Sequence, residues 1–447
     1  MSAVASRVWQ YRYVVLVALW LVYIINYFDR LAVLIFLPFI QEDLSLTPVQ
    51  TGWLASTFFF AYALAQVSAG YLADRIGPKK VMYVAIVVFS LVTGLTGLVR
   101  SFWQFIVLRI ALGFGEGHHF APAVRNISNW FPNSERGQAT SFLATSWSVA
   151  PIIVPVIVTS LAASFFGGDW RPVFFLLIIP GLIGLFLLWY FVSDSPEEMR
   201  DKGRLSNSEY ERIIEGRAAV TEQGEAVEES RKGYGLFLKD PYYYFYVVAL
   251  FCQVGIYWGT ITWLSTFLVS QHGMNLTQMG FFASTPYLAA LCATLLGGYL
   301  MDKVFGRMRP VALIAYLGSI PALFILGSIG NQPALLLTML LVSQFFANLN
   351  FGSIYAFLQK RYPREVVGSA AGLSNGIGQL GAFIAPLAAG YLVVVGADGS
   401  QNFGRVFAFF ATLAGVAALC SFFLREDSPL PSQSQTAATR TPAAKRA

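Results

Sequence analysis

Residues 70–77 read GYLADRIG, and residues 298–305, much later in the chain, read GYLMDKVF. Both copies carry a glycine, an aspartate and a basic residue in the same order, and apolar stretches flank each of them. Each copy follows the second apolar segment of a set of six and precedes the third. The repeat therefore predicts a chain of two halves that share one topology.

Twelve apolar segments make up these two sets, and most are close to the roughly 20 residues that a helix needs to cross a bilayer. This pattern predicts an all-α membrane protein with twelve transmembrane helices, arranged in two six-helix bundles related by a pseudo-two-fold axis. The segments are residues 13–39, 52–73, 81–99, 102–122, 139–165, 172–192, 243–270, 279–300, 310–329, 334–357, 368–395 and 403–424.

The composition supports residence in a membrane. Of the 447 residues, 56 % are hydrophobic and only 12 % are charged, whereas a soluble chain carries about 25 % charged residues. Most of the molecular surface therefore does not face water. The formal charge of +6 does not indicate a nucleic-acid partner, because Lys and Arg occur in short clusters between the apolar segments, as membrane topology requires.

Polar stretches divide the chain into domains. We expect an N-terminal six-helix bundle in residues 1–192 and a C-terminal six-helix bundle in residues 243–424. Residues 193–242 are expected to form a cytoplasmic linker, and residues 425–447 a disordered cytoplasmic tail. Both termini are expected in the cytoplasm, because Lys and Arg beyond the apolar segments then fall almost entirely on the inner side.

Four charged residues lie well inside apolar segments, away from the segment ends: Asp29, Arg30, Arg109 and Glu116. A charge at the bilayer centre costs at least about 2.5–3.5 kcal/mol, so four charges without a function are improbable. A guanidinium binds a carboxylate bidentately. An anion that pairs with the arginines would leave the acids to take up protons, which couples the two events. The alternative is a structural ion network that only holds the first and fourth segments together.

Several motifs resemble a known family. Residues 70–80, GYLADRIGPKK, resemble the loop signature of the major facilitator superfamily. NYFDR at 26–30, RIALGFGE at 109–116 and NWFPNSERG at 129–137 resemble its anion:cation symporter family. That family includes bacterial galactonate, hexuronate and glucarate transporters, and animal sialic-acid and vesicular glutamate transporters. The resemblance runs from the first segment to the twelfth.

The resemblance implies a role in transport for the four charges. In the galactonate-transporter branch, residues matching Asp29 and Glu116 carry protons. Residues matching Arg30 and Arg109 bind the substrate carboxylate or pair with the acids. The proton is therefore the expected coupling ion, and we expect no cofactor.

The resemblance also assigns neutral contacts and a gate. Tyr27, Tyr62 and Asn375 match substrate-contact positions of the family. The family's loop signature has a conformational role, which implies that Asp74 and Arg75 take part in gating. Residues Glu135 and Arg136 are expected to join the same inner network.

Further candidates come from spacing and from one departure. Tyr257 lies one turn from Gln253, and Gln379 one turn from Asn375, so both are candidate substrate contacts or simple bridges between helices. Sugar-acid transporters usually continue with small apolar residues after Glu116, where this chain has Gly-His-His-Phe. On a helix His119 projects nearer the face of Glu116 than His118 does, which makes His119 a candidate substrate contact.

We expect no metal site. The vicinal histidines point apart, and the cysteines show no metal-ligand spacing. Cys252, Cys292 and Cys420 lie in apolar segments and are interpreted as buried small hydrophobes.

The sequence thus favours a proton-coupled symporter of a small organic anion, a sugar acid or another carboxylate, which works by alternating access. Alternatives are an importer of an aromatic or dicarboxylic acid, and an exporter or facilitator that uses another ion. A membrane enzyme or receptor is disfavoured, because neither a catalytic motif nor a signalling domain is evident. We expect a monomer in a lipid bilayer, the bacterial inner membrane, with an organic anion and protons as partners and no nucleic acid.

Overall fold

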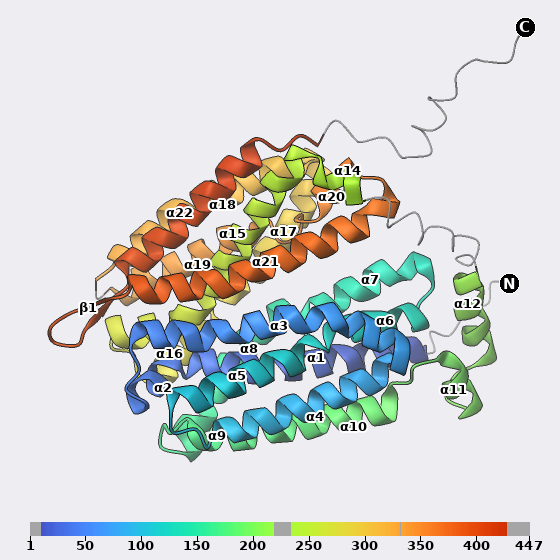
Figure 1. Ribbon diagram of the computed structural model, residues 1–447, viewed down its shortest axis with the longest axis horizontal. Helices are drawn as coiled ribbons and strands as arrows, with labels where there is room; N and C mark the ends of the chain where they lie inside the picture. Colours follow the sequence, from blue (N-terminus) through green and yellow to red (C-terminus); the bar gives the residue numbers. More distant parts are fainter. Residues whose placement is uncertain (1–9, 219–233, 331, 427–447) are drawn as a thin grey trace, which may run out of the picture. The chain divides into compact units, whose positions relative to one another are not determined.

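The computed structural model describes residues 10–218, 234–330 and 332–426, and helices account for every one of the twelve predicted segments (Figure 1). The all-α prediction is confirmed. The helices are α1 (Tyr11–Ile35), α2 (Leu37–Asp43), α3 (Pro48–Ile76), α4 (Pro78–Thr96), α5 (Phe102–Gly117), α6 (Phe120–Trp130), α7 (Asn133–Ala144), α8 (Ser146–Phe165), α9 (Arg171–Leu176), α10 (Ile178–Phe191), α11 (Pro196–Asp201), α12 (Asn207–Ala218), α14 (Tyr234–Leu238), α15 (Pro241–Thr266), α16 (Leu276–Ser284), α17 (Pro286–Tyr299), α18 (Met308–Ser328), α19 (Pro333–Leu349), α20 (Ala356–Arg361), α21 (Arg364–Leu392) and α22 (Gly404–Phe422).

Length and composition identify 8 helical stretches of the described chain that could each cross a membrane. The other four predicted segments correspond to α3, to α5 with α6, to α19 and to α21. Two π-helical stretches, Phe267–Gln271 and Leu300–Phe305, continue α15 and α17. A short antiparallel hairpin pairs β1 (Val394–Val395) with β2 (Gln401–Asn402) before α22.

The first copy of the repeat forms the end of α3, and its last residue, Gly77, makes the turn into α4, where glycine is favoured. Gly77 ends α3 with a φ of 92°, a conformation that costs glycine little, and Pro78 then occupies the first turn of α4. The corresponding glycine of the second copy is Gly306, with a φ of 62°. It comes one residue later than the alignment of the two copies suggests, and the π-helical stretch Leu300–Phe305 takes up the extra residue.

The described helices form two compact units. The first unit comprises Met1–Gln223, Ile261–Tyr287 and Pro386–Asn402, and the second comprises Gly224–Thr260, Leu288–Ala385 and Phe403–Ala447. Helices α15, α17 and α21 thus contribute to both units, and the halves 1–192 and 243–424 stay a prediction. Of the predicted linker, α11, α12 and α14 are helical and residues 219–233 lie outside the described part; the predicted disordered tail lies outside it from residue 427 onward.

One prediction about the cysteines is wrong. Cys252 is buried as expected, and Cys420 is half-buried, but Cys292 is exposed. Cys292 lies on α17 next to the fully buried Ala293, so it points away from the packed side of that helix.

Candidate functional site

Helices α1 and α5 bring two of the four intramembrane charges into contact. Nε and Nη2 of Arg30 donate hydrogen bonds of 3.0 and 2.8 Å to Oε2 of Glu116. Both side chains are almost completely buried, and Asp29 beside them is 3 % exposed. The second oxygen of Glu116, Oε1, has no hydrogen-bond partner within the described residues. The pair is therefore an ion pair with one unused acceptor.

Three aromatic rings surround the guanidinium of Arg30. Its central carbon lies 4.9 Å from the ring centre of Tyr27, 4.9 Å from that of Phe58 and 4.6 Å from that of Tyr62. Tyr27 and Tyr62 were predicted as site residues, and the structure places both here. Phe58 was not predicted, because a phenylalanine in an apolar helix carries no signal that separates it from a lipid-facing residue.

Arg109 on α5 is a buried cation with a different set of partners. Its Nε and Nη2 donate to the main-chain carbonyls of Leu54 and Ala55 on α3, at 3.1 and 3.3 Å. Its central carbon lies 4.7 Å from the ring centre of Phe58. Nη1 has no hydrogen-bond partner, and none of the described carboxylates lies within ion-pair distance. Arg109 thus keeps a donor and a full charge for a further group.

Two glycines of α5 explain why this helix can approach α3 so closely. A Cβ on Gly113 would lie 2.3 Å from the carbonyl oxygen of Phe58, and a Cβ on Gly117 would lie 2.5 Å from Cβ of Ala65. The glycines are four residues apart and so share one helix face, as in other close contacts of membrane helices. Because these glycines have no side chains, α5 lies close enough for Arg109 to reach α3 and for Glu116 to reach α1.

Replacing Gly113 by alanine is expected to destabilise the protein by about 1–3 kcal/mol, because the new methyl group must push α5 away from backbone atoms of α3. The measurement is the melting temperature of purified protein in detergent. Gly137→Ala on α7 is the matched control, since its Cβ would meet no atom within 4 Å. Equal melting temperatures for the two variants would contradict the packing argument.

The fourth predicted segment is interrupted at His118 and His119, directly after Gly117. Helix α5 ends at Gly117 and α6 begins at Phe120. Pro122 lacks the N–H that would pair with the carbonyl of His118, so the helix cannot continue regularly through this turn. Instead, the amide of His119 donates to the carbonyl of Glu116, at 3.1 Å. Interrupted helices with freed backbone groups are a recurrent feature of transporter sites.

The two histidines at the interruption have different environments. His118 is satisfied: its Nδ1 is 2.8 Å from the carbonyl of Phe114, and its Nε2 is 2.8 Å from Oγ of Ser68 on α3. The carbonyl can only accept, so Nδ1 donates to it. His119 is fully buried beside Tyr23, with ring centres 5.3 Å apart, and neither ring nitrogen finds a partner among the described residues.

Asn26 on α1 resembles His119 in this respect. It is fully buried, and within the described chain both its side-chain nitrogen and its oxygen are without partners. Buried polar groups are normally paired with protein or water. Asn26 and His119 therefore add unused hydrogen-bonding capacity near the charged residues.

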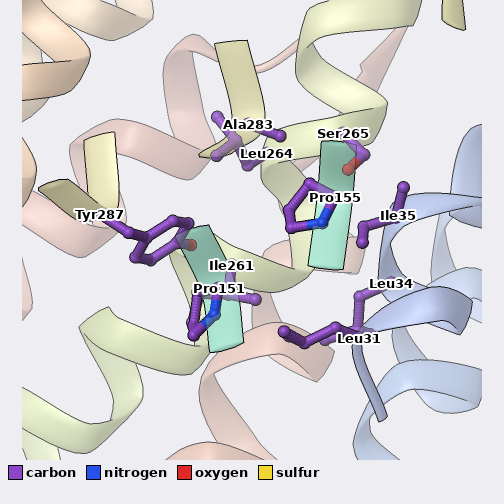
Figure 2. Close-up of a pocket in the computed structure, with 10 residues that line it drawn as sticks. All are labelled: Leu31, Leu34, Ile35, Pro151, Pro155, Ile261, Leu264, Ser265, Ala283 and Tyr287. Carbon is purple, nitrogen blue, oxygen red and sulfur yellow. The ribbon is translucent and has the colours of Figure 1, made fainter. Parts of the chain in front are cut away.

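A small cavity of the first unit lies just beyond Arg30 along α1 (Figure 2). Its walls are mostly apolar, and no cationic side chain lines it. A carboxylate there would lose its hydration without gaining a countercharge, so this cavity is not the anion site. Its lining residues are Leu31, Leu34, Ile35, Pro151, Pro155, Ile261, Leu264, Ser265, Ala283 and Tyr287.

Three predicted substrate contacts belong to the second unit. Tyr257 lies on α15 and packs edge-on against Trp258 and Phe351, with ring centres 5.3 and 5.2 Å apart. Asn375 and Gln379 lie on α21, and both are half-buried. Their role in binding stays a prediction.

The four predicted gating residues make separate contacts. Asp74 forms an ion pair of 2.8 Å with Arg125 of α6, and both side chains are more than half exposed. Arg75 donates to the hydroxyl of Tyr71, at 3.1 Å. Arg136 donates to the carbonyl of Phe131, at 3.0 Å. Glu135 instead pairs with Arg12 and Arg212.

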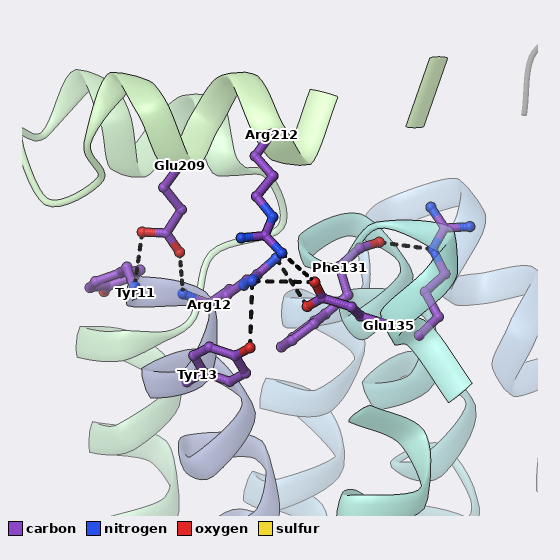
Figure 3. A network of polar contacts seen from close by, with 8 residues as sticks. Tyr11, Arg12, Tyr13, Phe131, Glu135, Glu209 and Arg212 are labelled. Atoms are coloured by element: carbon purple, nitrogen blue, oxygen red, sulfur yellow. Dashed lines mark hydrogen bonds and ion pairs between the residues drawn. The ribbon is translucent and has the colours of Figure 1, made fainter. Parts of the chain in front are cut away.

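Glu135 lies in a network at the start of α1 (Figure 3). It pairs with Arg12, which is buried, at 3.1 Å and with Arg212 of the linker helix α12 at 2.9 Å. Glu209 of the same linker helix accepts from the amides of Tyr11 and Arg12, at 3.0 and 3.1 Å. A carboxylate at this position caps the amino end of α1, whose own N-cap residue makes no side-chain bond.

Glu135→Ala is expected to lower the free energy of unfolding by about 2 kcal/mol, because it removes the countercharge of the buried Arg12. Arg212→Ala is the matched control: the Arg212 side chain is 56 % exposed, and an exposed ion pair contributes less than about 1 kcal/mol. Melting temperatures in detergent test both. A larger loss in Arg212→Ala would show that the linker helix, not Arg12, depends on Glu135.

Comparisons with known proteins agree with this architecture. The sequence profile of the Major Facilitator Superfamily matches residues 19–386 and, in a second match, residues 268–447. A solved structure of a bacterial homolog to the human lysosomal transporter Spinster, in an inward-facing and occupied conformation, superposes with a TM-score of 0.75. It is 18 % identical in sequence, and the match covers 93 % of this chain and 97 % of that chain.

Two relatives match over nearly their full lengths. A "Probable sulfoacetate transporter" of Cupriavidus necator is 29 % identical over 438 residues, which is 94 % of this chain and 96 % of that protein. A "Hexuronate transporter" of Bacillus subtilis is 28 % identical, and the match covers 91 % of this chain and 92 % of that protein. The fold and the relatives define a multi-pass membrane transporter and not an enzyme. The chain belongs to the Major Facilitator Superfamily and has its twelve-helix fold.

Proposed function

We propose that this transporter moves a small organic anion together with protons, and that Arg30 and Arg109 bind the anion. The observation that carries the proposal is the state of Arg109: it is 1 % exposed, and its charge has no carboxylate partner among the described residues. A buried cation without a paired carboxylate is costly, and an anionic substrate would supply that partner. Nη1 of Arg109 is free to donate to it.

The proposed coupling uses Glu116 and Asp29. An anion that draws Arg30 toward itself weakens the Arg30–Glu116 ion pair. The carboxylate of Glu116 then lacks a countercharge, and uptake of a proton neutralises it. Asp29 is the second proposed proton carrier, because it is buried next to Arg30 on α1. Charge balance within the bilayer thus links binding of the anion to binding of protons.

For the substrate, we propose a sugar acid or another small carboxylate. The relatives named above are described as transporters of sulfoacetate and of hexuronate, which are both small organic anions. The unused polar atoms of Asn26 and His119 support a substrate with hydroxyl groups beside its charge. We further propose a bacterial inner-membrane location with both termini in the cytoplasm, since that orientation places most Lys and Arg inside.

The test is uptake into proteoliposomes that contain the purified protein. The probes are D-glucuronate, D-galactonate, D-glucarate, sulfoacetate, cis,cis-muconate and benzoate, each supplied with and without an inward proton gradient. D-glucose is the matched control for D-glucuronate, because the two share a ring and differ in the carboxylate. Accumulation of an acid that requires the gradient is expected. Equal uptake of glucose and glucuronate, or accumulation that ignores the gradient, would contradict the proposal.

A further inference from the structure

We propose that the ring of Phe58 takes the place of the substrate's charged group in the empty transporter, and stabilises Arg30 and Arg109 until an anion binds. This inference rests on the proposed anion site and adds a positioning residue to it. Phe58 contacts both arginines, whereas Glu116 is hydrogen-bonded to Arg30 alone within the described residues.

The geometry is that of a shared cation–π contact. Phe58 is fully buried, and the central carbons of the two guanidinium groups lie 4.9 and 4.7 Å from its ring centre. Such contacts are attractive within about 6 Å, because the face of an aromatic ring is negative, and they are strongest where water is excluded. One neutral side chain thus partly offsets two cations that would otherwise repel each other.

The ring is fixed in this position from several sides. Its own backbone is packed against α5, since a Cβ on Gly113 would lie 2.3 Å from the carbonyl oxygen of Phe58. Tyr62 stacks on the ring with 5.7 Å between ring centres, and Phe59 packs edge-on at 5.2 Å. Arg109 is held over it by hydrogen bonds to carbonyls of the preceding turn. The contact is therefore part of the packed structure.

The Phe58 ring should stabilise the empty site more than the anion-bound site. In the empty site Arg109 is hydrogen-bonded to carbonyls and contacts this ring, while the carboxylate of Glu116 offsets its charge only from a distance. A bound anion supplies a full negative charge, so the ring contributes less to the loaded state than to the empty one. Weakening the ring's negative face should then destabilise the empty protein and tighten binding of the anion. If Phe58 only filled space, weakening its negative face would change neither the stability of the empty protein nor the affinity for the anion.

The experiment replaces Phe58 in the full chain by 4-fluoro- and 3,4,5-trifluorophenylalanine, which keep the ring's shape and progressively remove its negative face. The melting temperature of the empty protein in detergent is expected to fall in that order. The Kd of the best-bound acid of the panel above, measured by calorimetry, is expected to fall by about threefold to tenfold for the trifluoro ring. Release then slows, so kcat of uptake decreases while KM also decreases.

The control is the same series at Phe89 of α4, which is equally buried and has no guanidinium over its ring in the described structure. A second control combines trifluorination of Phe58 with Arg109→Met, where the effect of fluorine on melting should shrink. Melting temperatures that do not respond at Phe58, or respond equally at both positions, would overturn the proposal, as would a rising Kd.

The experiment distinguishes a failure of the proposed anion site from a failure of the inference about Phe58. If the wild-type protein binds none of the acids, the anion assignment fails, and the melting series of the empty protein still decides the role of Phe58. If the wild-type protein binds an acid and the fluorinated variants match it in Kd and melting temperature, the anion site stands and the inference about Phe58 fails.

Discussion

Glu116→Gln is expected to abolish proton-driven accumulation while exchange of the anion across the membrane continues. Glutamine keeps the size of the side chain and can still accept from Arg30, but it cannot take up a proton. A gradient of one pH unit is worth about 1.4 kcal/mol per proton, which supports about tenfold accumulation in one-proton symport. In the variant that ratio should fall to about 1, measured in the proteoliposome assay.

Two further measurements make this expectation specific. Counterflow, in which unlabelled anion inside drives entry of labelled anion, needs binding and reorientation but no net proton movement, so it should persist. Glu116→Asp keeps a titratable group and should recover part of the gradient-driven accumulation. Gradient-driven accumulation in Glu116→Gln at the wild-type level would remove Glu116 from the proton pathway, and the same assay on Asp29→Asn would then decide whether Asp29 carries the proton alone.

The membrane spans were predictable, because length and hydrophobicity are local properties. Each predicted apolar segment coincides with helical structure, and the segment 102–122 appears as α5 with the first part of α6. The interruption between these helices was not predicted, although Pro122 is its local cause. Proline in a membrane helix is often accommodated as a kink, so the residue alone does not tell a kink from a break.

The charged residues of the site were predictable, but their pairing was not. Arg109 and Glu116 share a helix face, yet seven residues of helix separate them by about 10 Å, too far for a direct ion pair. Which helix supplies the partner depends on tertiary packing. The glycines of α5 allow this helix to contact α3, where carbonyl oxygens accept from Arg109. Glu116 pairs with Arg30 of α1.

The contacts of Glu135 likewise depend on tertiary packing and could not be predicted from the sequence. Sequence proximity to a family motif associates Glu135 with Asp74, but the structure pairs Glu135 with Arg12 and Asp74 with Arg125. Arg12 lies more than a hundred residues earlier in the chain, and the contact exists because α7 approaches the start of α1. No local pattern encodes such an approach.

Arg109→Lys is expected to weaken anion binding by about 100-fold, which corresponds to about 2.7 kcal/mol. Arg109 uses Nε and Nη2 for the carbonyls of Leu54 and Ala55 and still has Nη1 for a ligand. A lysine ammonium is a single point charge and cannot satisfy both carbonyls and an anion from one fixed position. Calorimetry with the acid that the uptake assay identifies measures the change in Kd.

The matched control is Arg171→Lys in the first unit. Arg171 pairs with Asp43 through Nε and Nη2, at 3.1 and 2.7 Å, but both side chains are partly exposed. Its replacement removes the same forked geometry outside the membrane-buried site, so Kd should change less than about threefold, in line with the small contribution of exposed ion pairs. A comparable loss of affinity in both variants would mean that Arg109→Lys acts through folding. An unchanged Kd in Arg109→Lys would mean that the anion binds elsewhere, and that the buried charge of Arg109 is structural.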